Sequence, residues 1–136
     1  MYIIACLDNR NGMLFCGRRQ STDRALREQV LRISENSRLW MNPYSAKQFA
    51  EESRQIYVDA DFLSKASTQD YCFVENTEIA PYREKITGVI LYRWNRDYPA
   101  DKKFPMELFE KDWECTSRRD FRGFSHETIT EEIYCL

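Results

Sequence analysis

Histidine, glycine and proline are scarce in this sequence of 136 residues, which has one histidine, four glycines and four prolines. The single histidine, His126, excludes zinc sites of the H-x-H or H-E-x-x-H type. The low glycine and proline content excludes collagen-like and linker-like segments. No G-x-S-x-G motif occurs, so a Ser-His-Asp hydrolase has little support. We expect His126, between Ser125 and Glu127 in a predicted turn, to be exposed and inert.

The five cysteines form no C-x-x-C pair and are widely spaced, which favours reduced thiols over a disulfide framework. No apolar run approaches the roughly 20 residues that cross a bilayer. The first apolar run, Tyr2 to Leu7, is too short for a signal peptide and has no basic flank. We therefore expect a cytoplasmic protein without membrane association or a metal site.

Charge of one sign is not in excess, because 20 lysines and arginines face 22 acidic residues for a net charge of −2. This balance offers no bulk attraction for nucleic acid or anionic lipid. Gly17-Arg18-Arg19, with Arg24 and Arg27, forms a local basic patch that could grip a phosphate or an acidic partner. The alternative is a solvated face, since Asp23 and Glu28 lie in the same stretch. We expect a small-molecule ligand and no nucleic acid, and a homo-oligomer stays possible.

Apolar residues make up 43% of the chain and aromatic residues 14%, which predicts one domain over residues 1–136. Short apolar runs predict strands, at 2–7, 55–58, 71–74, 86–94, 112–117 and 128–134. Helices are predicted in three places: after an N-cap at Ser21 or Thr22, after Asn42-Pro43 with Ala46, Phe49 and Ala50 turned inward, and at 59–66. Residues 8–20 and 97–105 read as loops. Alternating strands and helices favour an α/β class, with a mostly parallel sheet flanked by helices and a C-terminal antiparallel hairpin.

Five segments, in this order, resemble the dihydrofolate reductase family. Residues 3–7 and then Gly12-Met13 resemble its first strand and the start of its mobile active-site loop, which leads to Asp23 in the opening turn of a helix. Residues 39–41 and the helix after them resemble the next strand-helix unit. Asp101-Lys102-Lys103-Phe104-Pro105 is similar to a D-x-x-F-P that closes a family loop. Asp112-Trp113-Glu114 and Glu132-Ile133-Tyr134 resemble the final hairpin, so the match covers both ends of the chain and thins in the middle.

The resemblance implies a catalytic role for Asp23. Its carboxylate would bind the amidine-like edge of a pterin through two charge-assisted hydrogen bonds and help deliver a proton. Three more residues would join Asp23 in the substrate site: Ala5, Arg27 and Tyr92. Four would contact an NADPH cofactor: Gly12, Met13, Ser45 and Thr77. The alternative for Asp23 is a solvated aspartate at a helix N-terminus, stabilised by the helix dipole.

Several positions depart from the family pattern on the substrate side. Residues 18–22 stand where the family carries a Trp and then a Pro, so the apolar pocket wall is missing. Arg27 lies one turn after Asp23 and can pair with it, which would lower the pKa of Asp23, the opposite of what a proton donor needs. Tyr92 stands roughly where a threonine usually supports the carboxylate, and its phenol could fill the pterin cavity.

The cofactor side departs further. Dinucleotide phosphates need bare backbone amides at helix N-termini, which the family supplies with a glycine pair and a Gly-Arg. Here those places read Glu75-Asn76-Thr77 and Asn42-Pro43-Tyr44-Ser45, so a proline removes an amide and Glu75 adds negative charge. We therefore expect a divergent dihydrofolate reductase-like protein with a degraded cofactor site, binding a small pterin- or nucleotide-like ligand or a protein partner. The alternative is an NADPH-dependent dihydrofolate reductase.

Overall fold

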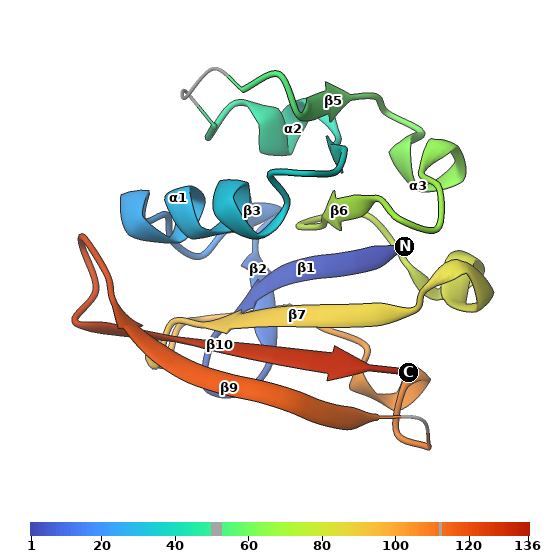
Figure 1. Cartoon of the computed structure of the whole chain (residues 1–136). Coiled ribbons are helices and arrows are strands. Elements are labelled where there is room, and N and C mark those ends of the chain that lie inside the picture. Colours follow the sequence, from blue (N-terminus) through green and yellow to red (C-terminus); the bar gives the residue numbers. More distant parts are fainter. Residues whose placement is uncertain (50–52, 112) are drawn as a thin grey trace.

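A seven-stranded sheet, in the order β5-β4-β6-β1-β7-β10-β9, runs through the molecule (Figure 1). The computed structural model describes residues 1–49, 53–111 and 113–136. The strands of this sheet are β1 (Tyr2–Leu7), β4 (Leu39–Met41), β5 (Ile56–Val58), β6 (Tyr71–Phe73), β7 (Gly88–Arg93), β9 (Glu114–Arg122) and β10 (Thr128–Cys135). Pairing is parallel from β5 to β7, whereas β10 is antiparallel to β7 and to β9. The predicted α/β class, mostly parallel sheet and C-terminal antiparallel hairpin are confirmed.

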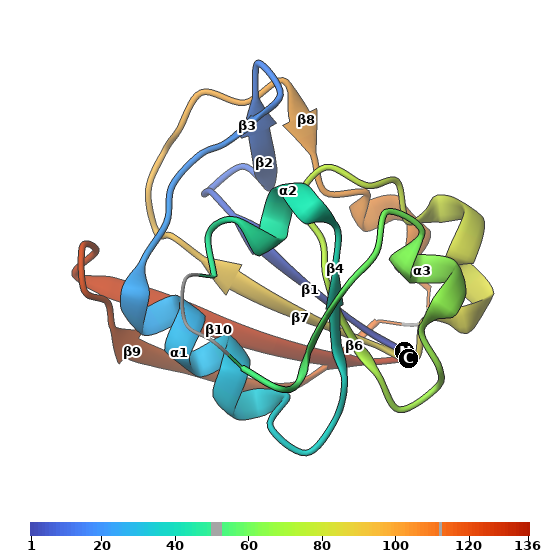
Figure 2. The ribbon, with the colours of Figure 1, turned by 90° about the horizontal axis from the view of Figure 1, so that it is seen from above.

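In the described residues, a second, smaller sheet and five helical segments complete the fold. The small sheet has the order β3-β2-β8 and is made of β2 (Gly12–Phe15), β3 (Arg18–Arg19) and β8 (Lys102–Lys103). In the view of Figure 2 it stands apart from the main sheet, past the end of β1. The helices are α1 (Arg24–Ile33), α2 (Pro43–Ala46) and α3 (Phe62–Lys65), with 3-10 helices η1 (Ala80–Lys85) and η2 (Met106–Leu108). None of the helices in the described part of the chain is long and apolar enough to span a membrane.

The two faces of β1 point into two cores, as the alternation of side chains along a strand requires. Ile3, Ala5 and Leu7 join a cluster that includes residues of α3 and the 104–109 segment. Ile4 faces the other way and packs with Leu26 and Val30 of α1. Each fully buried Leu, Ile or Val contributes about 1.5–3 kcal/mol to folding. Apolar contact therefore holds one face of α1 against the sheet.

Several predicted boundaries were wrong. The N-cap of α1 is Asp23 and not Ser21 or Thr22, because the Asp23 carboxylate accepts hydrogen bonds from the amides of Ala25 and Leu26. Asn42 caps α2 as expected, but α2 ends at Ala46 and does not carry Phe49, while Ala50 lies outside the described residues.

The β-structure in the predicted loops was also missed. Residues 8–20 hold β2 and β3, and residues 97–105 hold β8, strands too short to show alternation. β9 runs on to Arg122, well past the predicted end at residue 117, and Asp112 lies outside the described residues. All of β9 but Phe121 is exposed, so its sequence has no apolar face to reveal it.

Candidate functional site

Asp23 lies at the start of α1, against the turn that joins β9 to β10. Figure 1 shows the tip of this hairpin beside the first turn of α1. The Asp23 side chain is buried, with 2% of its surface exposed. It is therefore not the solvated cap that one alternative described.

The turn at residues 123–127 supplies most of the hydrogen-bond donors to this carboxylate. Oδ2 accepts from the amide of Ser125 at 2.8 Å and from its hydroxyl at 3.1 Å. The Phe124 amide lies 3.0 Å from both oxygens. A Cβ on Gly123 would stand 3.0 Å from Oδ2 and 2.4 Å from the His126 carbonyl oxygen, so only glycine allows this approach. The carboxylate thus ties the hairpin tip to α1.

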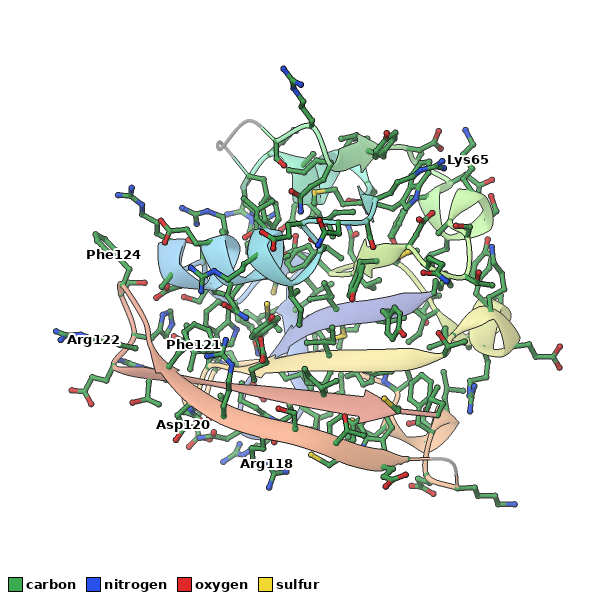
Figure 3. The ribbon with its side chains drawn as sticks, viewed as in Figure 1. Lys65, Arg118, Asp120, Phe121, Arg122 and Phe124 are labelled. Atoms are coloured by element: carbon green, nitrogen blue, oxygen red, sulfur yellow. The ribbon has the colours of Figure 1, made fainter. Side chains whose placement is uncertain are left out.

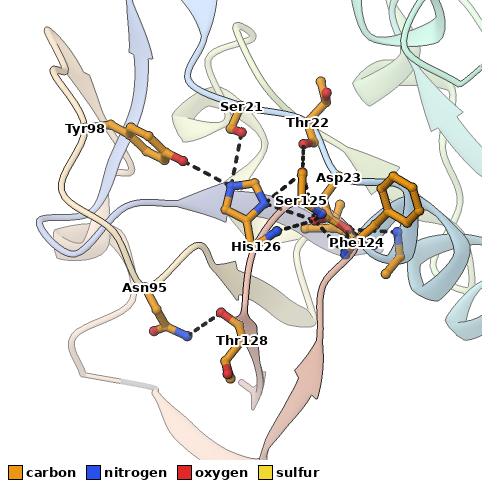
Figure 4. A network of polar contacts seen from close by, with 11 residues as sticks. Ser21, Thr22, Asp23, Asn95, Tyr98, Phe124, Ser125, His126 and Thr128 are labelled. Atoms are coloured by element: carbon orange, nitrogen blue, oxygen red, sulfur yellow. Dashed lines mark hydrogen bonds and ion pairs between the residues drawn. The ribbon is translucent and has the colours of Figure 1, made fainter.

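The prediction that His126 is exposed was wrong, because only 5% of its surface is accessible. Its Nδ1 lies 3.0 Å from Oδ2 of Asp23, and its ring stacks on Trp94 with centroids 4.5 Å apart. Its Nε2 lies 3.1 Å from the Ser21 hydroxyl and 3.0 Å from the Tyr98 hydroxyl (Figure 4). The single histidine is therefore the centre of a buried polar network. Sequence reasoning missed it because its contacts with Tyr98, Asp23 and Ser21 join residues 28 to 105 positions apart.

Burial alone would raise the pKa of the Asp23 carboxyl, but hydrogen bonds from Phe124, the His126 imidazole and Ser125 outweigh it. The pKa of Asp23 consequently lies well below its usual range. The carboxylate is ionised near neutral pH, and an ionised carboxylate is a poor proton donor. The sequence tied a lowered pKa of Asp23 to a pair with Arg27, whereas the structure gives it other causes, the hairpin turn, the His126 imidazole and the Leu26 amide.

A bridge of side chains closes the space at the carboxyl ends of β1 and β6. Arg19 of β3 binds Glu75 through two hydrogen bonds, Nε to Oε2 at 2.9 Å and Nη2 to Oε1 at 3.0 Å. The same guanidinium donates to the Tyr44 carbonyl and lies 4.3 Å from the centre of the Tyr44 ring. The Tyr44 hydroxyl in turn accepts from the Arg19 amide at 2.9 Å. These contacts join β3, the start of α2 and the end of β6.

The cavity left under this bridge is about 10 Å³, room for about one water molecule. It is lined by Cys6, Met13, Arg19, Gln20, Ser21, Val74, Glu75 and Trp94. Burial raises the pKa of the Cys6 thiol well above its usual value, which makes it unreactive. No described group of three or more His, Cys, Asp or Glu side chains could hold a metal ion.

The residues expected at the cofactor take part in contacts within the chain. The Asn42 side chain donates to Oδ1 of Asn76 at 2.7 Å and to Oγ1 of Thr77 at 3.3 Å. Ser45 is fully buried, and its amide donates to Asn42 at 2.9 Å. The Gly12 amide donates to Asp8 at 2.7 Å, and Met13 is 6% exposed. Only Met13 among the four lines the small cavity.

The residues expected at the substrate lie on different faces of the sheet. Ala5 is fully buried in the core opposite α1, whereas Tyr92 is fully buried on the α1 side. The Tyr92 hydroxyl donates to Oε2 of Glu131 at 2.9 Å, and Gln29 donates to the same oxygen. Burial and Glu131 raise the pKa of the Tyr92 phenol far above its usual value, so it stays protonated. Arg27 is part-buried on α1, and its amide donates to the Asp23 carbonyl.

An open groove of about 440 Å³ lies beside the closed cavity, between the β2–β3 hairpin and the 98–99 segment. Its lining is Phe15, Cys16, Arg18, Arg19, Gln20, Tyr98 and Pro99. Phe15 leaves 47% of its surface exposed, and Arg18 is exposed beside it. Arg18 belongs to the basic patch seen in the sequence, whereas Phe15 and Tyr98 were not predicted as site residues.

The fold has a clear relative among solved structures. No protein-family model and no curated protein matches the sequence. A dihydrofolate reductase from Enterococcus faecalis, solved in complex with NADP(H) and RAB-propyl, superposes with a TM-score of 0.71. The superposition covers 98% of this chain and 94% of that one, at 9% sequence identity. The chain therefore has a dihydrofolate reductase-like fold, as the order of its segments predicted.

Proposed function

We propose that this chain is a binding protein on a dihydrofolate reductase-like fold, which takes a small nucleotide-like ligand and does not use NADPH as a reductase does. The observation that carries the proposal is the bridge of Arg19, Glu75 and Tyr44. It fills the space between the start of α2 and the end of β6, where the family resemblance puts the cofactor phosphates. In this arrangement the residues do not fit a dinucleotide.

The charge interaction between Arg19 and Glu75 supports a structural role for the bridge. Burial lowers the pKa of Arg19, but its hydrogen bonds and charge interaction with Glu75 outweigh burial and raise it above the usual value. The pair is bidentate and its side chains are mostly shielded, at 21% and 10% exposed. Charge-assisted bidentate pairs are among the stronger polar contacts in proteins. A phosphate entering here would have to displace Glu75 from Arg19 and would meet a negative charge.

The groove between the β2–β3 hairpin and Tyr98 offers what a nucleotide-like ligand needs. Phe15 and Tyr98 supply apolar ring faces on which a planar base can stack, worth about 1–3 kcal/mol per base. Arg18 supplies an exposed cation for a phosphate. The volume of about 440 Å³ lies within the range of ligand pockets.

Calorimetric titration of the full chain with adenosine monophosphate, guanosine monophosphate and NADPH tests this proposal. We expect heat of binding with a monophosphate and none with NADPH at 1 mM, about the limit of a measurable weak complex. Arg18→Glu should abolish monophosphate binding, whereas Arg38→Glu, an exposed arginine beside β4, should leave it unchanged. Monophosphate binding that survives Arg18→Glu would show that the ligand does not bind in the groove. Saturable NADPH binding would show that the cofactor site is not closed.

The alternative function is an NADPH-dependent reductase of a folate or pterin, with Asp23 as its proton-relay carboxylate. The relative solved with NADP(H) favours it. It requires the Arg19–Glu75 pair to open and the 123–127 turn to release Asp23. Consumption of NADPH with dihydrofolate, abolished by Asp23→Asn, would establish this alternative.

A further inference from the structure

His126 joins a carboxylate on one edge of its ring to two hydroxyls on the other. Oδ2 of Asp23 lies 3.0 Å from Nδ1, while the hydroxyls of Ser21 and Tyr98 lie 3.1 and 3.0 Å from Nε2. Figure 4 shows the Ser21 and Tyr98 hydroxyls converging on one ring nitrogen, with Asp23 on the far edge of the ring. A carboxylate, an imidazole and a serine hydroxyl in line are the parts of an acyl-transfer relay.

The proton positions in this relay follow from its partners. An ionised carboxylate can only accept a hydrogen bond. In the neutral form of His126, Nδ1 therefore carries the proton and donates a hydrogen bond to Asp23. In that form Nε2 has one lone pair, which the hydroxyls of Ser21 and Tyr98 share as donors. This is the tautomer that a general base requires.

The imidazole is held in this orientation by contacts on several sides. Its ring stacks on Trp94, and its own amide donates to Oδ2 of Asp23 at 3.2 Å. A general base that does not have to reorient costs less to use in the transition state.

Ser21 is partly exposed, in contrast to the buried Asp23 and His126 side chains behind it. Ser21 lines the small cavity of about 10 Å³, which shares Arg19 and Gln20 with the open groove that Tyr98 lines. The groove has Phe15 and Pro99 on its walls, which suit an acyl chain or an aromatic leaving group. A small ester bound in the groove would therefore lie next to the cavity that Ser21 lines.

We propose that Ser21 is the nucleophile of an ester-hydrolysing site, with His126 as general base, Asp23 as its positioning residue and Tyr98 as donor to the oxyanion. The substrate class is a small carboxylic ester. The absence of a G-x-S-x-G motif does not oppose this assignment, because such relays are defined by geometry and occur on unrelated folds.

The reaction closes with water as the only co-reactant. The Ser21 oxygen attacks the ester carbonyl and its proton passes to Nε2 of His126. Since Nε2 no longer accepts, the Tyr98 hydroxyl is released to donate to the negative carbonyl oxygen. The intermediate expels the alcohol, which takes the proton from His126 and leaves an acyl group on Ser21. Water, deprotonated by His126, then attacks the acyl carbonyl, and the Ser21 oxygen departs with that proton.

Acylation of the full chain by p-nitrophenyl acetate tests the assignment. We expect a burst of about one p-nitrophenolate per chain and an acetyl group located on Ser21 by mass spectrometry of peptides. Ser21→Ala should lower the acylation rate at least about 100-fold, the scale of general-base catalysis. Tyr98→Phe should lower it by about 100-fold, the effect of one oxyanion donor. Ser117→Ala, on the exposed β9 strand, is the matched control and should leave the rate unchanged.

The folding of each variant is checked by thermal denaturation, because His126 is buried. For a folded His126→Gln chain we expect no acetyl on Ser21. The proposal is overturned by three results: no acylation, an acetyl group on Tyr98 or a lysine in place of Ser21, or an unchanged rate in Ser21→Ala. Monophosphate binding measured on Ser21→Ala keeps this test separate from that of the proposed function, since that variant leaves Phe15 and Arg18 in place.

Discussion

At the scale of single residues, the Asp23 carboxylate has more donors than a helix cap needs. Amides of Ala25 and Leu26 come from its own helix, while Phe124, Ser125 and His126 come from the hairpin turn about 100 residues later. Hydrogen bonds to a charged group contribute about 1.5–3 kcal/mol each when one partner is removed. Asp23 is therefore a tie between the first helix and the last hairpin.

Asp23→Asn should lower the free energy of unfolding by about 2–4 kcal/mol, because an amide has one accepting oxygen and leaves buried donors unpaired. Urea denaturation measures this. Asp97→Asn, an exposed aspartate that accepts one hydrogen bond from Asn9, is the control and should change stability by less than about 0.5 kcal/mol. Equal changes in the free energy of unfolding for the two substitutions would show that Asp23 does not hold α1 to the hairpin turn.

The same carboxylate makes stability depend on acid. Because the pKa of Asp23 is lower in the folded chain than in the unfolded one, the unfolded chain binds the extra proton first as pH falls. The contribution of Asp23 to the free energy of unfolding is complete above the pKa of about 3.9 that its carboxyl has in the unfolded chain. It is lost as pH falls from there through the pKa of Asp23 in the folded chain. Asp8 and Asp70 also have lowered pKa values and add to the slope. The difference in stability between the parent chain and Asp23→Asn should therefore shrink below pH 4, and a constant difference down to pH 2 would contradict this.

At the scale of elements, the β2–β3 hairpin shapes the open groove with a two-residue turn. Phe15 pairs with Arg18, and both residues between them have positive φ, 51° at Cys16 and 73° at Gly17. Positive φ at both positions is the geometry of a type I′ turn, which favours Asn-Gly. Cys16 is thus a strained choice at the first position.

Cys16→Asn should stabilise the chain by about 0.5–1 kcal/mol, since asparagine tolerates the left-handed region and the Cys16 amide can still donate to Asp101. Thermal denaturation checks this, with Cys115→Asn on exposed β9 as a control expected to be neutral or destabilising. Destabilisation by Cys16→Asn would show that the hairpin does not adopt this turn.

The sequence predicted elements well where one face is buried and poorly where none is. Apolar residues recur at strand or helix spacing in β1, β6, β7 and α1, so these elements could be predicted. β9 has almost no buried side chain, and Phe124 at its turn projects into solvent with 74% of its surface exposed (Figure 3). The turn that reaches Asp23 therefore had no local signal except Gly123 and the lone histidine.

At the scale of the whole molecule, two sets of long-range contacts connect distant parts of the chain. Asp23 connects α1 to the 123–127 turn, and Arg19 connects β3 to Glu75 and Tyr44. The order of the five family-like segments predicted the fold correctly. The partners of Asp23 and Arg19 depend on the conformation of loops, which the spacing of apolar residues does not predict. From the sequence, Asp23 could be named as a candidate site residue, but its hydrogen-bond partners could not be predicted.

A titration with NADPH tests whether the Arg19–Glu75–Tyr44 bridge closes the cofactor region. NADPH is added to the parent chain and to Glu75→Gln, which weakens the bridge, while the melting temperature is followed. A ligand at 100 times its dissociation constant adds about 2.7 kcal/mol of stability. We predict no shift for the parent chain at 1 mM NADPH. A saturable rise in its melting temperature would show that the cofactor region is open to NADPH.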